Sequence, residues 1–303
     1  MASSLTSPGL VFAADKAIVA ARKHLEMLSL FTTDFSDEAI NPGTTLKIPV
    51  FSGSAADFNA GSSHGYNDVE GAVKWAAIDF STHKKLTFGF QDKDKLLVDT
   101  DPFWSKCGVA AGQGVGAALL AVATSKLVYT AATQIKGWSV SLANMAALRA
   151  KCATNNLDPA RCVVILEPVS YAALLALLPA NVIGDGSAVI TGVAKGLFGF
   201  KAVIEGTTIS TADGAATNTG LGFVVPEDAL AVGCRVIDGS GTSEEWGTGK
   251  DEITGFTLGH RITVDQNGGF RNYTVEALIG AALTDQSSNG APKILQLSEA
   301  EVS

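Results

Sequence analysis

The sequence predicts an α+β fold, and three features of its 303 residues lead to this prediction. Two long apolar segments have helical character, one near the start of the chain and one that begins just after residue 100. A ribbon around residue 80 and a pair of segments around residue 267 alternate between apolar and polar side chains, as strands do. Between them, helices and short buried strands follow one another among glycine-rich loops, which is typical of a compact α/β unit.

The composition narrows the class of protein. Hydrophobic residues make up 47% of the chain and charged residues 17%, which excludes a wholly disordered chain. The net charge of -8 argues against a surface that neutralises a nucleic-acid backbone, because such affinity comes mainly from Lys and Arg. The first residues lack the basic and apolar regions of a signal peptide. We expect Cys107, Cys152, Cys162 and Cys234 to be reduced core thiols, because they have no metal-ligand spacing.

The first helix is expected at residues 12–31, where an amphipathic pattern carries basic residues in its middle. The segment "NPGTTLKIPVF" then predicts a turn and a short strand. Residues 52–68 are rich in Gly, Ser, Asn and Asp, and they predict an exposed, mobile loop.

In the ribbon at residues 75–91 every second residue, at the even-numbered positions, is apolar except Thr82 and Lys84. We call these positions the apolar parity of the ribbon and the odd-numbered positions its polar parity. The apolar members are Ile78, Phe80, Leu86, Phe88 and Phe90. Fully extended, the ribbon would span roughly 55 Å at ~3.3 Å per residue, whereas a globule of this length is about 50 Å across. The ribbon therefore either bends and splits or projects as one arm of a hairpin. In the second case its aromatic side chains need cover from a partner molecule.

The second long helix is expected to begin at "DTDPFW", because Thr100 or Asp101 can cap it and Pro102 suits its first turn. It should run towards Lys126 or beyond. Three of its glycines, Gly108, Gly112 and Gly116, recur at every fourth position and so lie on one stripe.

The glycines admit three interpretations. A nucleotide-binding loop needs its glycines in a tight turn between a strand and a helix, whereas these lie well inside a helix. A membrane span over 107–125 is disfavoured by Gln113 and by the excess of Ala and Gly. We expect instead a packing surface that another backbone or sheet approaches closely, at a cost of about 1 kcal/mol per glycine relative to alanine.

The remainder of the chain predicts alternating helices and strands. The expected segments are a helix at 141–156 closed by two asparagines, a buried strand at 161–168, a helix up to Pro179, strands within 197–206 and 221–233, and a hairpin over 254–283 with its turn at Asn267 and Gly268. The tail from Thr284 is polar and expected to be loose.

No catalytic, cofactor-binding or metal-ligating constellation is predicted. The histidines fall in four different elements without a metal-binding spacing, and His83 lies on the polar parity of the ribbon, where we expect it to be solvated. No nucleophile elbow or reactive-cysteine signature is present. The alternating charges from Asp92 to Lys95 favour a solvated turn over an inter-subunit ion pair. Glu244, Glu245 and Trp246 are expected in a glycine-rich loop, and no other candidate binding residues are expected beside them.

The order of these elements resembles the major capsid proteins of tailed bacteriophages, which have the Hong Kong 97-type fold. The resemblance extends over nearly the whole chain. Its motifs, in order, are "LKIPVF", "FSTHKKLTFGFQDKDKLLVDTDPFWSKC", "NMAALRAKCATNNLDPARCVVILEPVSYAALL" and "RITVDQNGGFRNYTVEALIGAA". Each motif is loose, and their succession carries the likeness.

The resemblance implies a domain organisation. The expected parts are an N-terminal arm (1–45), an extended β-hairpin loop (46–90), a peripheral domain (91–136 and 255–283) with the glycine-bearing helix as its spine, an axial α/β domain (137–254) and a C-terminal tail (284–303). The extended loop would lie over a neighbouring subunit. The inter-subunit contacts expected from it are Ile78, Phe80, Lys84, Leu86, Phe88, Phe90, Asp92 and Lys93.

The resemblance also implies a function. The chain would be a non-enzymatic shell protein that self-assembles into hexamers and pentamers of an icosahedral head, enclosing double-stranded DNA without binding its sequence. Assembly would take place in the cytoplasm of a bacterial host, with a portal and without a membrane, and the product would be the virion. A scaffolding segment fused to such proteins precedes the arm, and because the arm helix is expected near residue 12 we expect a separate scaffolding protein. The alternatives are an encapsulin-like compartment shell, a cytoplasmic nucleotide-using enzyme and a membrane-anchored surface protein.

Overall fold

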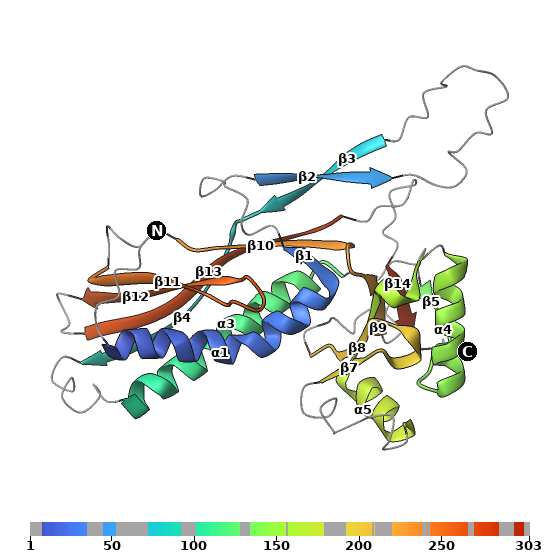
Figure 1. Ribbon diagram of the computed structural model, residues 1–303, viewed down its shortest axis with the longest axis horizontal. Coiled ribbons are helices and arrows are strands. Elements are labelled where there is room, and N and C mark those ends of the chain that lie inside the picture. Colours follow the sequence, from blue (N-terminus) through green and yellow to red (C-terminus); the bar gives the residue numbers. More distant parts are fainter. Residues whose placement is uncertain are drawn as a thin grey trace.

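The computed structural model describes residues 8–34, 45–52, 72–91, 101–127, 134–155, 157–178, 192–207, 209, 220–237, 241, 243–265, 270–284 and 294–299. Within them, two larger sheets and one two-stranded sheet form the framework. Two long helices lie along one face of the first sheet, and two shorter helices flank the second sheet at the other end of the molecule (Figure 1).

The helices follow the sequence pattern closely. They are α1 (Pro8–Phe31), α3 (Asp101–Thr124), α4 (Leu142–Thr154), α5 (Pro168–Leu177) and two short 3-10 helices at Pro159–Arg161 and Leu197–Gly199. The hydroxyl of Ser141 caps α4 by accepting a hydrogen bond from the backbone N–H of Asn144 at 3.0 Å. Asn155 ends α4, as the sequence predicts, while α1 begins earlier and α3 ends slightly earlier than expected.

The first sheet is organised around its longest strand, β13. Its strands are β1 (Thr32–Asp34), β4 (Thr82–Gln91), β10 (Leu230–Arg235), β11 (Glu245–Lys250), β12 (Thr257–Asp265) and β13 (Phe270–Leu283). β13 pairs antiparallel with β12, β10 and β4. The pairing of Asp265 with Phe270 confirms two antiparallel strands in the predicted hairpin, whose turn at Asn267 and Gly268 lies outside the described residues.

The second sheet has the strand order β5-β14-β9-β6-β8-β7. Its strands are β5 (Gln134–Ile135), β6 (Cys162–Leu166), β7 (Val193–Lys195), β8 (Ala202–Glu205), β9 (Gly220–Pro226) and β14 (Leu295–Ser298). The two-stranded sheet consists of β2 (Thr45–Ser52) and β3 (Ala72–Asp79).

Three expectations about the chain after residue 220 are corrected. The segment expected as one strand within 221–233 is two, because β9 ends at Pro226 in the second sheet and β10 begins at Leu230 in the first. β10 and β11 thereby join the first sheet, although residues 137–254 were expected to form the axial domain. The tail is also not loose throughout: Leu295 and Leu297 of β14 are buried, since β14 pairs with both β5 and β9.

The glycine stripe of α3 faces α1. A Cβ atom on Gly108 or Gly112 would collide with the backbone carbonyl oxygen of Ala13 or Ala17, respectively, and one on Gly116 would lie 3.2 Å from the backbone of Ala21. The two helices therefore approach with backbone against backbone over three successive turns. Residues 8–31 of the expected N-terminal arm are thus part of the core of this same chain.

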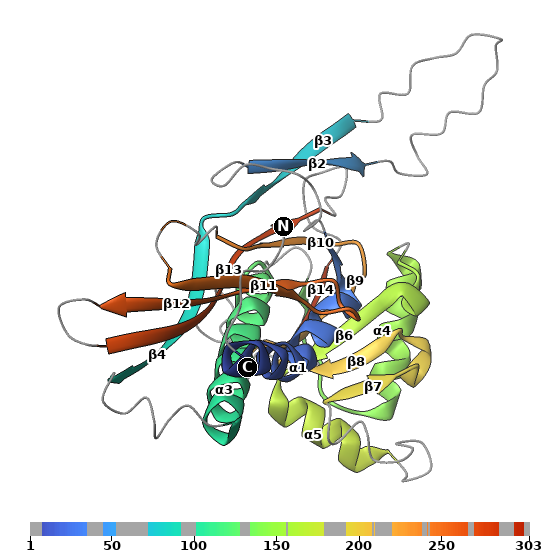
Figure 2. The same ribbon diagram turned by 60° about the vertical axis from the view of Figure 1, so that its left-hand side comes forward.

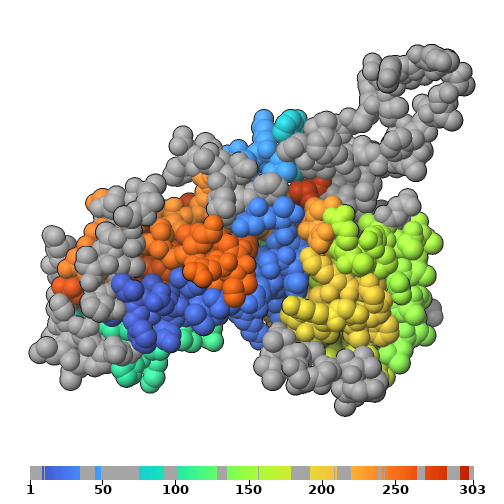
Figure 3. Space-filling view, viewed as in Figure 1, coloured from blue at the N-terminus to red at the C-terminus, as the bar shows by residue number. Residues whose placement is uncertain are grey.

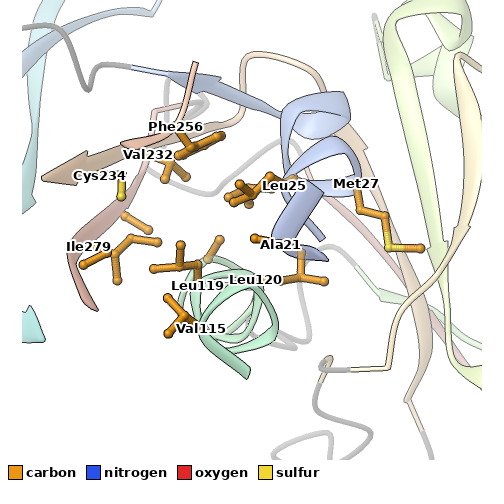
Figure 4. Packing of buried hydrophobic residues seen from close by; sticks show 14 of the residues in the cluster. Ala21, Leu25, Met27, Val115, Leu119, Leu120, Val232, Cys234, Phe256 and Ile279 are labelled. Atoms are coloured by element: carbon orange, nitrogen blue, oxygen red, sulfur yellow. The ribbon is translucent and has the colours of Figure 1, made fainter. Parts of the chain in front are cut away.

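The main hydrophobic core lies between α1, α3 and the first sheet. Leu25 of α1, Leu119 and Leu120 of α3, Val232 of β10 and Ile279 of β13 are all buried and lie around one interior (Figure 4). By length and composition, residues 102–124 of α3 could cross a membrane, with a mean hydropathy of 1.5. The buried face of α3 is accounted for by α1 and the sheet, which makes it a core helix here.

Candidate functional site

The β2–β3 hairpin lies on the face of the first sheet opposite the two long helices. Figure 2 shows it standing away from α1 and α3, and in the space-filling view its atoms project above the main body (Figure 3). Ile48, Ala76 and Ile78 of the hairpin, with Phe80 just beyond it, form a small core against Ala231 of β10 and Ala282 of β13. This hairpin is the most prominent projection within the described residues and the first candidate for contact with another molecule.

Two glycines of the first sheet form the surface, here called the hairpin seat, against which the β2–β3 hairpin packs. Gly233 of β10 and Gly280 of β13 are paired across the strands, and neither has a side chain to raise the surface. A Cβ atom on Gly233 would lie 2.5 Å from the Phe80 ring, and one on Gly280 would collide with Ile78. The guanidinium of Arg235 lies over the Phe80 ring, 4.9 Å from its centre, in a cation–π contact.

The ribbon bends and splits, so its apolar side chains are covered within the chain. Phe80 and Ser81 form the turn between β3 and β4, after which β4 pairs with β13 at the edge of the first sheet. Ile78 and Phe80 are 0% and 4% exposed, and the half-buried side chains beyond the turn (Leu86, Phe88, Phe90) pack against the main core. The inference that these rings need cover from another molecule is therefore wrong, because the turn shortens the ribbon and sends its two halves to different parts of the protein.

Aromatic packing fixes the far end of β4. The ring of Phe90 makes edge-to-face contacts with Phe103 and Trp104 of α3, with ring centres 5.9 Å and 5.8 Å apart. Trp104 makes a similar contact with Tyr273 of β13 at 5.8 Å. Among the other expected contact residues, Lys84 is half-buried on β4, while Asp92 and Lys93 lie outside the described residues.

The exposed face of the hairpin carries a large aromatic residue that the sequence reasoning missed. Trp75 of β3 is 62% exposed and lies on the face opposite Ile78. It shares the polar parity of the ribbon with Asp79, Ser81 and His83. A tryptophan on an otherwise polar parity was the available signal, because burying one face of the strand leaves the other face to solvent or to a partner.

The polar parity of β4 is only partly solvated. His83 Nε2 lies 2.9 Å from a carboxylate oxygen of Glu276, which is 1% exposed and also accepts a hydrogen bond from Arg261 at 2.8 Å. The hydroxyls of Thr87 and Thr274 are hydrogen-bonded to each other at 2.9 Å. These contacts tie β4 to β13 and β12. His83 is exposed, as the sequence predicts, although one nitrogen of its ring contacts Glu276.

Two other buried ionisable groups, Asp251 and His260, have structural partners. The carboxylate of Asp251 accepts two hydrogen bonds from Arg22, at 3.0 Å and 2.8 Å, and two from Thr254, which join α1 to the chain after β11. Burial alone would raise the pKa of Asp251, but these hydrogen bonds outweigh it and the pKa lies below its ordinary value. Burial lowers the pKa of His260 to about 4, and its Nδ1 lies 3.1 Å from the Tyr273 hydroxyl.

The described part of the chain shows no site for a metal ion and no phosphate site at the glycine stripe of α3. It contains no group of three or more His, Cys, Asp or Glu residues that could hold a metal ion. The glycine stripe of α3 is filled by the backbone of α1, which leaves no room there for a phosphate. Glu245 and Trp246 do not lie in a loop as expected, because they are the first two residues of β11 and pair with β12. Glu244, just before the strand, pairs with Arg271 at 3.0 Å, and the indole N–H of Trp246 donates to the carbonyl of Ile237.

Comparisons with known proteins find relatives by structure. No family model matches the chain, and no curated protein matches its sequence. The capsid of Ralstonia phage GP4 aligns with a TM-score of 0.53 at 10% identity, covering 90% of this chain and 88% of that one. The capsid of the cyanophage P-SCSP1u aligns with a TM-score of 0.50 at 15% identity, covering 88% and 86%. The capsid of an empty GTA particle aligns with a TM-score of 0.50 at 12% identity, covering 90% and 96%.

These alignments show that the chain has a mixed helix-and-sheet fold of the kind seen in phage capsid proteins. The coverage is high on both sides, so the likeness includes both larger sheets rather than a single motif. At these identities, what the alignments show is the fold.

Proposed function

We propose that this chain is the major capsid protein of a tailed bacteriophage, a structural protein that assembles into hexamers and pentamers of an icosahedral head. The observation that carries the proposal is the structural likeness to capsid chains of phages over about nine-tenths of both partners. The proposed head encloses double-stranded DNA, is built in the cytoplasm of a bacterial host and uses a separate scaffolding protein and a portal. The net charge of -8 is consistent with a wall that encloses DNA without binding it tightly.

The parts of the chain take corresponding roles in this proposal. The first sheet with α3 as its spine is the peripheral domain, and the second sheet with α4 and α5 is the axial domain. The β2–β3 hairpin is the base of the extended loop, and β4 belongs to the peripheral sheet because it pairs with β13. The boundary between the two sheets lies at residues 227–229, between β9 and β10.

Exposed apolar side chains support self-assembly. Trp75 is 62% exposed on the hairpin, Ile253 is 66% exposed beyond β11, and Val169 is 74% exposed on α5. On α5 the outward residues are apolar, while the polar Ser170 and Tyr171 are buried. A stable monomer gains nothing from such surface, whereas neighbouring copies in a shell would remove it from water.

Electron microscopy of the purified chain tests the proposal directly. We expect closed shells, or rings of five and six copies, when the protein is concentrated, and sedimentation velocity should show the same species in solution. Co-expression with a scaffolding protein should sharpen the size distribution of the shells. A chain that stays monomeric under all of these conditions would contradict the proposal.

The Trp75→Ser variant tests the hairpin as a contact surface. Because Trp75 is 62% exposed, we expect the free energy of unfolding to change by less than about 0.5 kcal/mol while shell formation is lost. Ala77→Ser on the same face of β3 is the matched control and should assemble normally. Normal shells from Trp75→Ser would remove this face from the proposed interface without affecting the fold assignment.

A further inference from the structure

The helix α5 has an inverted amphipathic pattern. Its buried side includes the polar residues Ser170 and Tyr171, whereas its exposed side is apolar and none of its residues is charged. The exposed positions of α5 are Pro168, Val169, Ala172, Ala173, Ala176 and Leu177. A surface helix normally turns its polar and charged residues to water, so this side of α5 suits contact with another molecule.

A second surface of the same chain has the shape to receive α5. The core-facing side chains of α4 are Met145, Leu148 and Cys152. The opposite side of α4 carries four exposed alanines, here called the alanine line: Ala143, Ala146, Ala147 and Ala150. Because alanine side chains are short, another helix can approach this line closely, and the larger Val169 of α5, which is 74% exposed, can pack between them.

Both helices pack against the same face of the second sheet, because their buried side chains belong to one hydrophobic cluster. They lie at separate places on the outside of that sheet (Figure 1). One copy of the chain can therefore present α5 to one neighbour and the alanine line to another.

The charges at the helix ends indicate how the two surfaces would be oriented. Glu167 directly precedes α5, and its carboxylate accepts a hydrogen bond from the Ser170 hydroxyl at 3.0 Å. Lys151 lies in the last turn of α4, whereas the last turn of α5 has no basic residue. With α5 antiparallel to α4 of another copy, Glu167 comes beside Lys151, and the positive end of the α5 dipole lies beside the negative end of the α4 dipole. Pairing α5 with a second α5 would offer Glu167 no such cation.

The size of the surface favours a ring over a dimer. A ten-residue helix is about 15 Å long and about 10 Å wide, so α5 covers roughly 150 Å², well below about 800 Å² per partner in a typical stable complex. Because the contact joins two different surfaces, it repeats from copy to copy until a ring closes. Such repetition makes a contact that is weak in isolation effective in the assembly.

We propose that the exposed side of α5 docks antiparallel on the alanine line of α4 in a second copy of this chain, with Val169 against Ala150. The inference rests on the proposed function, because rings of five and six copies are the assemblies in which this contact would repeat. It adds the pair of surfaces that joins neighbouring copies within a ring.

Disulfide crosslinking of the full chain tests this inference. In the double variant Val169→Cys with Ala150→Cys, the two new thiols lie on the surfaces that would meet, and the four native cysteines are buried. After mild oxidation of the concentrated protein, we expect a ladder of linked chains that ends at five or six copies on a non-reducing gel. Each single variant should run as a monomer. A linked dimer from Val169→Cys alone would indicate pairing of α5 with α5 and would overturn the proposal.

Electron microscopy of the same sample distinguishes failure of this inference from failure of the proposed function. Rings or shells without a ladder would overturn the contact between α5 and α4 and leave the capsid proposal in place. A ladder without rings of five or six copies, or shells, would support the contact and contradict the capsid proposal. The absence of both a ladder and rings would overturn both proposals.

A pair of matched substitutions provides the control. Val169→Glu places a charge within the proposed contact, and Val19→Glu places the same charge on a valine of α1 that is 57% exposed. We expect both variants to keep the melting temperature of the wild-type protein, because exposed positions contribute little to stability. Val169→Glu should lose the rings, whereas Val19→Glu should keep them. Normal rings from Val169→Glu, or equal losses in the two variants, would overturn the assignment of the contact to α5.

Discussion

The two faces of the first sheet are covered in different ways. On one face, α1 and α3 bury a large core and meet backbone to backbone along Gly108, Gly112 and Gly116. On the other face, the β2–β3 hairpin rests chiefly on Ile78 and Phe80, which occupy the space left by two strand glycines. Both faces use glycine to allow close approach, but the first contact extends over three helical turns and the second over a few side chains.

This difference separates the body of the protein from its projection. The helices can leave the inner face only if the main core opens, whereas the hairpin can move after losing a few contacts. Local stability in proteins follows the number of buried apolar contacts in this way. A segment that contacts different neighbouring molecules is better attached through a few side chains, as the β2–β3 hairpin is, than through a large core.

The largest effect is expected at the helix contact. In Gly112→Val the new side chain would occupy the position of the Ala17 carbonyl, and because backbone cannot move aside cheaply we expect a loss of about 5 kcal/mol in the free energy of unfolding. Urea unfolding followed by circular dichroism measures it. Gly114→Ala is the control on the same helix, since its Cβ would meet only the flexible end of Leu86 at 3.2 Å. Equal losses in both variants would show that helix propensity, rather than the α1 contact, governs this position.

A smaller effect is expected at the hairpin seat. Phe80→Ala removes a ring that is 4% exposed, and we expect a loss of about 3 kcal/mol together with faster proteolysis between β2 and β3. The contact of α1 with α3 should be unchanged, which hydrogen exchange of the two helices can show. Uniformly faster exchange throughout the protein would mean that the two faces are not independent.

The smallest effect is a pH dependence from the inner face. The pKa of His260 is about 4 in the folded chain and 6.5 in the unfolded chain, so the unfolded chain takes up the proton first. Stability should therefore fall as the pH drops from 6.5 towards 4, by about 2 kcal/mol at pH 5. In His260→Gln, which does not titrate, the slope over this range should decrease. An unchanged slope would assign the dependence to other groups.

The helices and the closing hairpin could be predicted from the sequence because their patterns are local. The spacing of Gly108, Gly112 and Gly116 and the cap at Ser141 need no knowledge of distant residues. The partner of the glycine stripe could not be predicted, since nothing in α3 specifies the matching alanines of α1. The candidate contact site has the same limit. The alternation of the ribbon at residues 75–91 identified which of its faces is buried, but not which residues cover that face.

Three features were missed for physical reasons. The turn at Phe80 and Ser81 has no glycine or proline to mark it, so the sequence left a bent and a continuous ribbon equally open and did not give the position of the bend. Trp75 could not be assigned because the alternation of a strand shows which face is apolar but not which side chains of the other face stay exposed. β14 is a short strand in a polar tail, and its burial depends on two neighbours, β5 and β9, that are distant in the sequence.

The position of β14 has a consequence for synthesis. It lies between β5 and β9, and it follows both of them in the chain. Because translation runs from the N-terminus to the C-terminus, the facing edges of β5 and β9 emerge from the ribosome before the strand that pairs with them. Until residues 295–298 have been synthesised, those two edges are open to pairing with other polypeptides.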